Sequence, residues 1–209
     1  MFKKSEFPGK FITFEGIEGS GKTTNINFFA EYLRSNGIDI VLTREPGGTP
    51  MGEKIRSALL ANYAEEVYPI TEILLLFAAR SQHIENIIKP ALRDGSCVLS
   101  DRFTDATYAY QGGGRGIPFQ DIMLLENMVQ KEFRPDFTII FDIPVEISLK
   151  RIQKRKNIDR IEQEKIGFFN KVRQVYLDRA KNVSGKYKII DATKPLQEVQ
   201  NILQNMFPL

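Results

Sequence analysis

The stretch that decides the fold is residues 11–25, which read FITFEGIEGSGKTTN. An apolar run ends in a glycine-rich segment, residues 16–23, that matches the pattern G-x-x-x-x-G-K-[ST]. Glycines let the backbone turn so that successive N–H groups face one anion, and the helix that follows adds the positive end of its dipole. The stretch therefore predicts a P-loop between a strand and a helix.

We expect this loop to bind the phosphates of a nucleotide. The charge of Lys22 would lie on the outer phosphates, and the hydroxyl of Thr23 would face Mg²⁺. The predicted residues of this nucleotide site, which the family resemblance described below assigns to ATP, are Gly16, Ile17, Glu18, Gly19, Ser20, Gly21, Lys22, Thr23 and Thr24.

The loop alone leaves kinases, switch GTPases and transport or motor ATPases open. A GTPase needs the guanine-reading pattern N-K-x-D, whereas Asn170 and Lys171 continue as Val-Arg. A transport ATPase would need docking elements for which a chain of 209 residues has little room. The motifs outside the loop therefore have to decide the function.

Apolar runs alternate with helical patterns along the chain. Strands are predicted at residues 10–16, 38–43, 96–101, 137–143 and 187–192. Helices are predicted at residues 23–37, 51–61, 69–92, 119–133, 145–154, 162–181 and 195–206. This alternation predicts an α/β fold with a five-stranded parallel sheet and helices on both faces, in a single domain over residues 1–209.

The composition narrows the class of protein. Apolar residues make up 42% and charged residues 26%, which favours a packed core, and the formal net charge of +3 is too small to indicate nucleic-acid binding. The single cysteine, Cys97, lies in the apolar run SCVLS and is expected to be a buried thiol, and the single His83 cannot build a zinc site. The start, MFKKSEFPGK, is too short and polar for a signal peptide, and no run approaches the ~20 apolar residues of a membrane span, so we expect no membrane association and a cytoplasmic location.

Three further clusters stand at or shortly after strand ends. They are TREPGGT at residues 43–49, DRF at residues 101–103 and YAYQGGGRG at residues 108–116. Taken singly, the first could be an ordinary turn and the second a surface ion pair. Ligands bind at the carboxyl ends of parallel strands, so the three together predict a second anion site facing the P-loop.

The motifs EGIEGSGKTT, TREPGGT, SDRF and AYQGGGRG together closely resemble those of thymidylate kinases, from Phe11 to near the C-terminus and in the same order. The resemblance implies a P-loop NTPase fold, transfer of the γ-phosphoryl of ATP to dTMP with Mg²⁺, a homodimer and a place in dTTP synthesis. Two rivals stay open: another nucleoside monophosphate kinase, acting for example on dCMP, and a nucleotide-dependent switch without transfer activity.

The resemblance assigns residues to the phosphates and the metal. Arg44 and Glu45 correspond to the loop beside the monophosphate, and Arg56 to the arginine that reaches it. Arg102 resembles the arginine near both phosphoryl groups, and Asp101 the acid that helps to hold Mg²⁺.

The nucleoside of dTMP is assigned by the same resemblance. Arg80 would hydrogen-bond thymine, Gln111 would read the base from its other side, and Thr107 would lie near the base. Tyr110 resembles the aromatic that crowds the ribose C2′, and Glu18 the loop carboxylate that faces the 3′-hydroxyl.

One position departs from the commonest pattern. Many members carry a phenylalanine four residues before the thymine-binding arginine, where this chain has Leu76, and Phe77 stands three residues before Arg80. We assign Phe77 to the thymine site, with packing in the core as the open alternative.

The P-loop has Gly19 and Ser20 where some members carry an arginine. The segment KRIQKRKNIDRIEQE therefore resembles the basic lid of bacterial enzymes, at about residues 151–162, although a solvated basic helix is the alternative. Of the three arginines Arg151, Arg155 and Arg160, we assign Arg155 and Arg160 as catalytic cations. The other residues that we assign a catalytic role are Lys22, Glu18 and Arg102.

The predicted reaction is direct in-line transfer without a covalent intermediate, driven by alignment and charge neutralisation. For the homodimer, the helices near residues 51–60 and 73–88 are the candidate faces.

Overall fold

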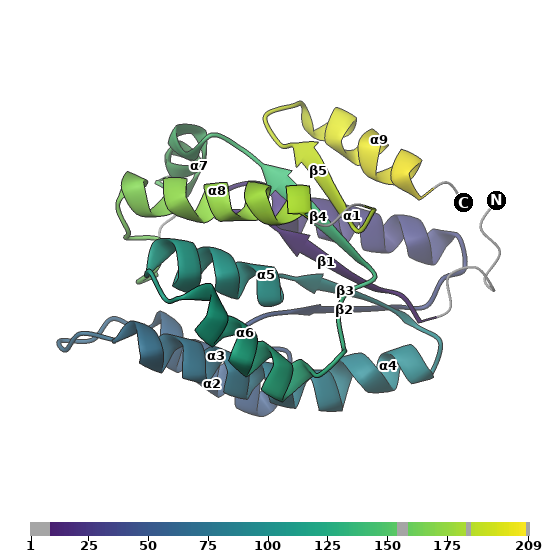
Figure 1. The fold of residues 1–209 in the computed structure, drawn as a ribbon. Helices are drawn as coiled ribbons and strands as arrows, with labels where there is room; N and C mark the ends of the chain where they lie inside the picture. The colour runs from purple at the N-terminus through teal and green to yellow at the C-terminus, as the bar shows by residue number, and fades with distance from the viewer. Residues whose placement is uncertain (1–8, 154–158, 183–184, 208–209) are drawn as a thin grey trace.

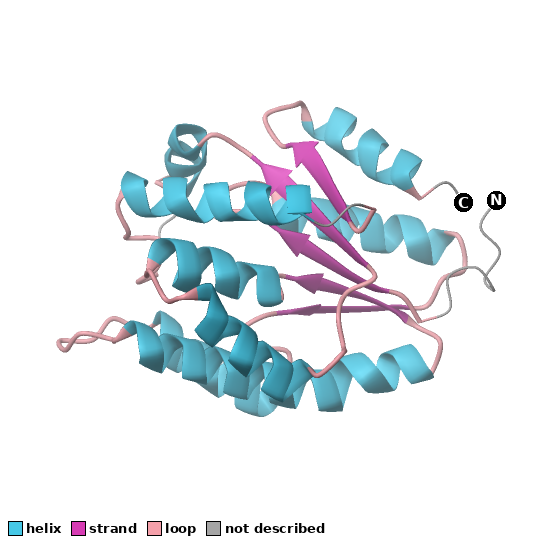
Figure 2. Cartoon of the chain, viewed as in Figure 1, coloured by secondary structure: helices cyan, strands magenta, loops and turns pink. Residues whose placement is uncertain are grey.

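The computed structural model describes residues 9–153, 159–182 and 185–207. Its centre is a five-stranded, all-parallel sheet in the order β2-β3-β1-β4-β5, drawn in magenta in Figure 2. The strands are β1 (Phe11–Glu15), β2 (Ile40–Arg44), β3 (Cys97–Asp101), β4 (Phe137–Asp142) and β5 (Tyr187–Asp191). The predicted sheet is thereby confirmed, strand by strand.

Helices connect the strands and cover the sheet. They are α1 (Lys22–Ser35), α2 (Pro50–Leu60), α3 (Pro69–His83), α4 (Lys89–Arg93), α5 (Thr104–Thr107), α6 (Phe119–Gln130), α7 (Val145–Ile152), α8 (Ile166–Asn182) and α9 (Leu196–Met206). Two π-helical segments, η2 (Ile84–Ile88) and η3 (Tyr108–Gly114), continue α3 and α5. In the described ranges, no helix has the length and apolar character needed to cross a membrane.

The two faces of the sheet are filled by alternate residues of its strands. Phe14 of β1 and Leu99 of β3 belong to the same buried cluster as Phe29 of α1. Phe11 of β1 and Val98 of β3 point to the opposite face and belong to the cluster that α4 and η2 complete. Figure 1 shows α1 behind the strands and α5 and α8 in front of them, where Tyr176 of α8 donates to Glu15 of β1 (2.9 Å). Full burial of each large apolar side chain contributes about 1.5–3 kcal/mol, so the strands are held from both sides.

The long helix predicted for residues 69–92 is interrupted. The structure has α3, then the wider turn of η2, then α4. Pro90 explains the interruption, because it has no N–H to donate and its ring excludes the usual approach to the carbonyl four residues earlier. Ile84, Ile88 and Ala91 still face the sheet.

The strand order positions the P-loop at the centre of the carboxyl edge. The chain extends to β3 and β2 on one side of β1 and to β4 and β5 on the other, so the loop after β1 lies where the order reverses. Phe14 pairs with Asp101 across the β1–β3 ladder, which brings the start of the P-loop beside the DRF cluster. Cys97 is buried on β3 as predicted, and burial raises the pKa of its thiol to about 11.

Candidate active site

The P-loop joins β1 to α1 in a conformation that needs glycine. Gly16 has φ 132°, and a Cβ atom there would lie 2.5 Å from the carbonyl oxygen of Phe141. Gly21, with φ 88°, directly precedes the first turn of α1. The loop thus leads into the N-terminus of a helix of 14 residues, whose unpaired N–H groups and dipole favour an anion.

Lys22 is folded over this loop. Its ammonium donates to the carbonyl oxygens of Gly16 (2.8 Å) and Ile17 (3.1 Å). Burial, and then the nearby charge of Arg102, lower its pKa to about 8. A bound phosphate would place a negative charge beside this ammonium and favour its charged form, so the site suits an anion.

A first cleft, which we call the P-loop cleft, opens over these residues. Its lining includes most of the predicted ATP-binding residues, namely Glu18, Gly19, Gly21, Lys22, Thr23 and Thr24. The side chain of Ile17 instead joins the hydrophobic core, and the Ser20 hydroxyl is buried without a hydrogen-bond partner in the described structure.

Thr23 and Asp101 lie together in the P-loop cleft. The hydroxyl of Thr23 is 3.4 Å from Oδ2 of Asp101, while Oδ1 of Asp101 is buried and accepts no hydrogen bond from the described residues. Nη1 of Arg102 lies 3.7 Å from the same Oδ1. A hydroxyl and a carboxylate are hard oxygen ligands, which suit Mg²⁺. No cluster of three or more acidic, histidine or cysteine side chains suited to a metal occurs in the described ranges, so most ligands would come from nucleotide and water.

Arg102 projects between the P-loop cleft and a second pocket and lines both. Its φ of 70° is unusual for a residue other than glycine, and its neighbours hold it there. Ser100 donates to its carbonyl oxygen (2.8 Å), and the N–H of Phe103 donates to the buried carboxyl of Glu15 (2.7 Å). The guanidinium is therefore delivered by a backbone fixed on both sides.

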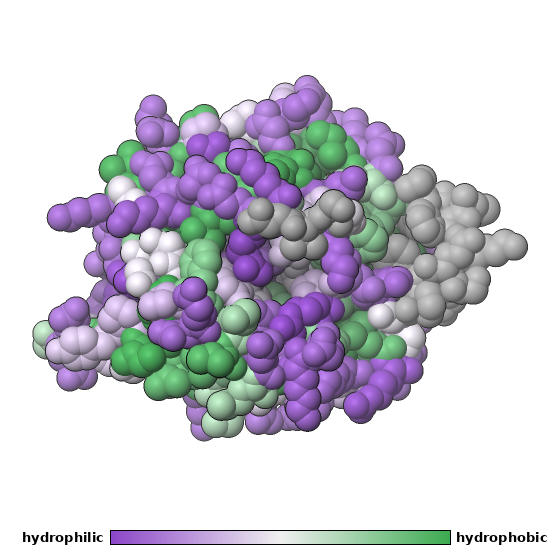
Figure 3. All heavy atoms as spheres, viewed as in Figure 1, coloured by the Kyte–Doolittle hydropathy of each residue, from purple (hydrophilic) through white to green (hydrophobic). Residues whose placement is uncertain are grey.

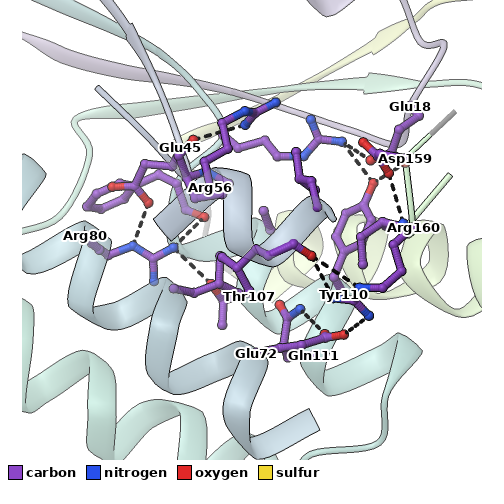
Figure 4. Close-up of a pocket in the computed structure, with 18 residues that line it drawn as sticks. Glu18, Glu45, Arg56, Glu72, Arg80, Thr107, Tyr110, Gln111, Asp159 and Arg160 are labelled. Carbon is purple, nitrogen blue, oxygen red and sulfur yellow. Dashed lines mark hydrogen bonds and ion pairs between the residues drawn. The ribbon is translucent and has the colours of Figure 1, made fainter. Parts of the chain in front are cut away.

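The second pocket gathers the residues assigned to dTMP. Eight of the predicted residues line it, namely Glu18, Glu45, Arg56, Arg80, Arg102, Thr107, Tyr110 and Gln111. They come from the P-loop, the loop after β2, α2, α3, the end of β3, α5 and η3. Figure 4 shows most of them pointing toward one space.

Glu45 forms a buried ion pair with Arg80. Its Oε2 accepts from Nε of Arg80 (2.7 Å), its Oε1 lies 2.9 Å from Nδ1 of His83, and Arg80 also donates to Thr107 (2.9 Å; Figure 4). Burial alone would raise the pKa of Glu45, but Arg80 and His83 outweigh it and hold that pKa below its ordinary value. Nη1 of Arg80 is buried without a partner in the described structure, which leaves a donor for a ligand.

Arg56 lines both the P-loop cleft and the second pocket. It donates to the carbonyl oxygen of Pro46 (3.0 Å), and burial together with the like charges of Arg44 and Arg102 lowers its pKa. A phosphate placed here would be attracted by Arg56 and Arg102 at once.

Two predicted dTMP contacts are placed elsewhere. Phe77 is 2% exposed and packs with Ile73 and Ile122 in the core, so Leu76 rather than Phe77 lines the pocket. Successive helical residues point about 100° apart, so only one of the two can face the base, and Phe77 lies under Arg80 at 4.7 Å instead. Arg44 pairs with Glu53 and lines neither of the two clefts.

Arg151 and Arg160 of the predicted lid lie at different sites in the structure. Arg151 donates to the carbonyl oxygen of Gly19 in the P-loop (3.0 Å). Arg160 instead lines the second pocket, where it donates to Glu72 (2.7 Å) and to the carbonyl oxygen of Leu59 (2.9 Å). Arg155 lies outside the described residues.

Sequence reasoning missed two buried acids. Glu72 lines the second pocket, and Glu15 fixes the peptide after Arg102. Glu72 stands in an apolar helix and Glu15 in an apolar strand, so both interrupt a hydrophobic pattern at positions that are 1% and 0% exposed. A carboxylate placed where the pattern demands an apolar residue is the signal that could have found them.

A P-loop at the centre of a parallel sheet, facing a second pocket lined with arginines, defines the class of nucleoside monophosphate kinases. The particular family follows from three comparisons.

Residues 14–203 match the family model for thymidylate kinase. The chain is 54% identical over 198 residues to the thymidylate kinase of Pseudomonas putida (strain W619), covering 95% of this chain and 96% of that protein. It is 53% identical over 200 residues to that of Pseudomonas entomophila (strain L48), with 96% and 95% covered. The solved structure of thymidylate kinase from Ehrlichia chaffeensis superposes with a TM-score of 0.75 at 34% identity, over 94% of this chain and 97% of that one.

The chain therefore belongs to the thymidylate kinase family. It is an enzyme, a phosphotransferase of the nucleoside monophosphate kinase kind, which phosphorylates dTMP in nucleotide biosynthesis.

Proposed function

We propose that the protein transfers the γ-phosphoryl group of ATP directly to dTMP, with Mg²⁺, giving ADP and dTDP for dTTP synthesis in the cytoplasm. One observation carries the proposal. Four residues line both the P-loop cleft and the second pocket, so a donor and an acceptor bound in the two spaces would meet at these side chains. They are Glu18, Arg56, Arg102 and Asp159.

On the donor side, the P-loop and the start of α1 would hold the triphosphate of ATP. Lys22 would lie on the outer phosphates, where its buried ammonium gains an opposite charge. Arg151, at the carbonyl of Gly19, is the lid arginine that the described structure brings nearest to this loop. Arg155 stays a prediction as a γ-phosphoryl cation.

Thr23 and Asp101 would hold Mg²⁺ on this side, Asp101 directly or through water. The ion would neutralise charge on the transferring phosphoryl group and its bridging oxygens. The buried oxygen of Asp101 that accepts no hydrogen bond from the described residues supports this assignment.

On the acceptor side, Arg56 and Arg102 would hold the phosphate of dTMP. Arg80 and Gln111 would contact the base, and Tyr110 would lie against the sugar. Guanidinium groups suit this phosphate because they offer paired donors in a fixed plane.

The chemistry needs no covalent intermediate and no general base. An oxygen of the dTMP phosphate, already largely ionised at neutral pH, forms the new bond to the γ-phosphorus while the bond between that phosphorus and the β–γ bridging oxygen breaks. ADP leaves with the electron pair of the broken bond. Catalysis would come from alignment and from the positive charge of Lys22 and Arg102 on the moving group.

We further propose a homodimer, through a face that differs from part of the sequence prediction. Ile73, Ile84 and Ile88 are buried within the chain. Exposed apolar side chains instead gather on the outer sides of α3 and α6, the hydrophobic cluster at the lower left of Figure 3. They are Ile70, Leu74, Phe119, Met123, Leu124 and Met128. A contiguous patch of this kind is typical of a protein–protein interface.

A coupled ADP-release assay with ATP and Mg²⁺ tests the proposed reaction. We expect rapid ADP formation with dTMP and only slow release without an acceptor. A panel of dTMP, dUMP, dCMP and dGMP at fixed ATP identifies the acceptor class. ADP release that does not depend on any acceptor would contradict the proposal.

A further inference from the structure

Glu72 is a buried carboxylate on the wall of the second pocket. It stands in the first turn of α3, is 1% exposed, and binds three side chains. Its Oε1 accepts from Nη1 of Arg160 (2.7 Å), and its Oε2 accepts from Nε2 of Gln111 (3.0 Å) and Nε of Arg115 (3.3 Å). Figure 4 shows Glu72, Gln111 and Arg160 joined in this way beside the pocket.

This environment makes Glu72 an acceptor on both of its oxygens. Two guanidinium groups contact it, Arg115 and Arg160, and a guanidinium can only donate hydrogen bonds. Each oxygen of Glu72 already accepts from at least one of these side chains. Any partner of this carboxylate must therefore present a donor.

The amide of Gln111 has one donor end and one acceptor end, so Glu72 fixes its orientation. The reversed amide would set its oxygen against the carboxylate, an arrangement disfavoured roughly tenfold to a hundredfold. With the nitrogen held by Glu72, the opposite atom of the amide is an oxygen. Within the part of the chain that the structure describes, Oε1 of Gln111 accepts no hydrogen bond, and Gln111 itself lines the pocket.

We propose that Glu72 is a specificity-determining positioning residue: by holding the nitrogen of Gln111, it presents the amide oxygen to the ligand and selects a pyrimidine that carries hydrogen on ring N3. Thymine and uracil have that hydrogen, whereas cytosine presents a lone pair there. The inference deepens the proposed function and rests on the assignment of the second pocket to a pyrimidine monophosphate.

Arg80 supports the same selection from another side. Its guanidinium is held by Glu45 and Thr107, and its unpartnered buried Nη1 can only donate. A donor suits the 4-carbonyl of thymine or uracil and opposes the 4-amino group of cytosine. The two contacts thus favour one base class, but only the contact through Gln111 depends on Glu72.

The substitution Glu72→Gln tests the proposal, because a glutamine at this position can donate as well as accept and lets the Gln111 amide turn. We expect the ratio of kcat/KM for dTMP to that for dCMP to fall about tenfold or more. Arg115→Lys is the matched control. It changes a partner of Glu72 but leaves the carboxylate, so the ratio should be retained.

A double-variant cycle shows whether Glu72 acts through Gln111. Gln111→Leu removes the amide oxygen and should lower the ratio, and adding Glu72→Gln to it should lower the ratio no further. Additive losses would overturn the proposal. Calorimetric titration with N3-methyl dTMP gives a binding readout: the wild type should bind it at least tenfold more weakly than dTMP, and Glu72→Gln should show a smaller difference.

The outcomes separate the two levels of the assignment. A wild type that does not prefer dTMP over dCMP contradicts the proposed function itself. A wild type that prefers dTMP and a Glu72→Gln variant that prefers it equally overturn only the role of Glu72. If Glu72→Gln does not melt cooperatively, Glu72→Met replaces it: the side chain keeps a similar volume but no longer accepts from Gln111, so the ratio should again fall about tenfold, and an unchanged ratio would overturn the proposal.

Discussion

The carboxylate of Glu18 and the guanidinium of Arg102 form an ion pair, with 2.6 Å between Oε1 and Nη2. The other carboxylate oxygen accepts from the hydroxyl of Tyr110. A residue of the P-loop thus holds two residues of the second pocket, which explains a carboxylate inside an anion-binding loop. Its two oxygens are occupied by Arg102 and Tyr110, while the side chain lines both the P-loop cleft and the second pocket.

Glu18→Ala should impair use of dTMP while ATP binding survives. Arg102 and Tyr110 lose a shared partner, and loss of such a charged hydrogen bond costs about 2 kcal/mol, or roughly thirtyfold in kcat/KM for dTMP. The dissociation constant of ATP, measured without acceptor, should change less than about threefold, since the loop backbone and Lys22 supply that site. Tyr110→Phe is the control that keeps the ion pair. Equal weakening of both substrates would refute the role.

Arg151 and Arg160 should affect different substrates, because one contacts the P-loop and the other the second pocket. We expect Arg151→Ala to raise KM for ATP and Arg160→Ala to raise KM for dTMP, each about tenfold for one lost charged contact. Steady-state kinetics with each substrate varied in turn measures both. If Arg160→Ala altered only ATP kinetics, Arg160 would be acting as a phosphate cation after all.

The sheet and most of the site were predictable because they depend on local patterns. Strands buried on both sides read as apolar runs, and the P-loop residues are adjacent in sequence. Contacts between distant segments were not predictable. The position of Arg160 depends on Glu72, 88 residues away, and nothing in the spacing of the lid arginines distinguishes Arg160 from Arg151.

Leu76 lines the second pocket in place of the predicted Phe77, and this difference has another cause. Both residues fit an apolar helix, and a rotation of one residue decides which of them faces the pocket. The interruption of the long helix by η2, before Pro90, leaves the sheet-facing residues in place. The apolar periodicity across residues 84–91 therefore gave no sign of the interruption.

The proposed dimer face makes a prediction about assembly. Leu124 and Met128 are 65% and 75% exposed on α6, and an interface there would bury both. Leu124→Glu together with Met128→Glu should therefore shift the protein from dimer to monomer in sedimentation velocity. Ile189→Glu is the matched control, because Ile189 is 48% exposed on the edge strand β5, away from this face. A wild type that sediments as a monomer at every concentration would contradict the interface.

Glu15 gives the fold a pH dependence. Burial, and then the neighbouring charge of Asp105, raise its pKa from 4.5 to about 8, although Arg102, Tyr176 and the N–H of Phe103 act in the opposite direction. Between these two values the folded protein keeps a proton that the unfolded chain has released. The stability that this group contributes is therefore complete below about pH 4.5 and is lost as the pH rises through about 8.

Glu15→Gln should remove this dependence, since the amide resembles the protonated carboxyl and does not titrate. From pH 6 to pH 8, we expect the unfolding free energy of the wild type to fall relative to that of the variant by roughly 1 kcal/mol per pH unit. Urea denaturation of both proteins at several pH values in this window measures the difference. The other titrating groups are common to the two chains, so their contribution cancels in the comparison. Parallel curves would mean that Glu15 is already ionised in the folded protein at pH 6.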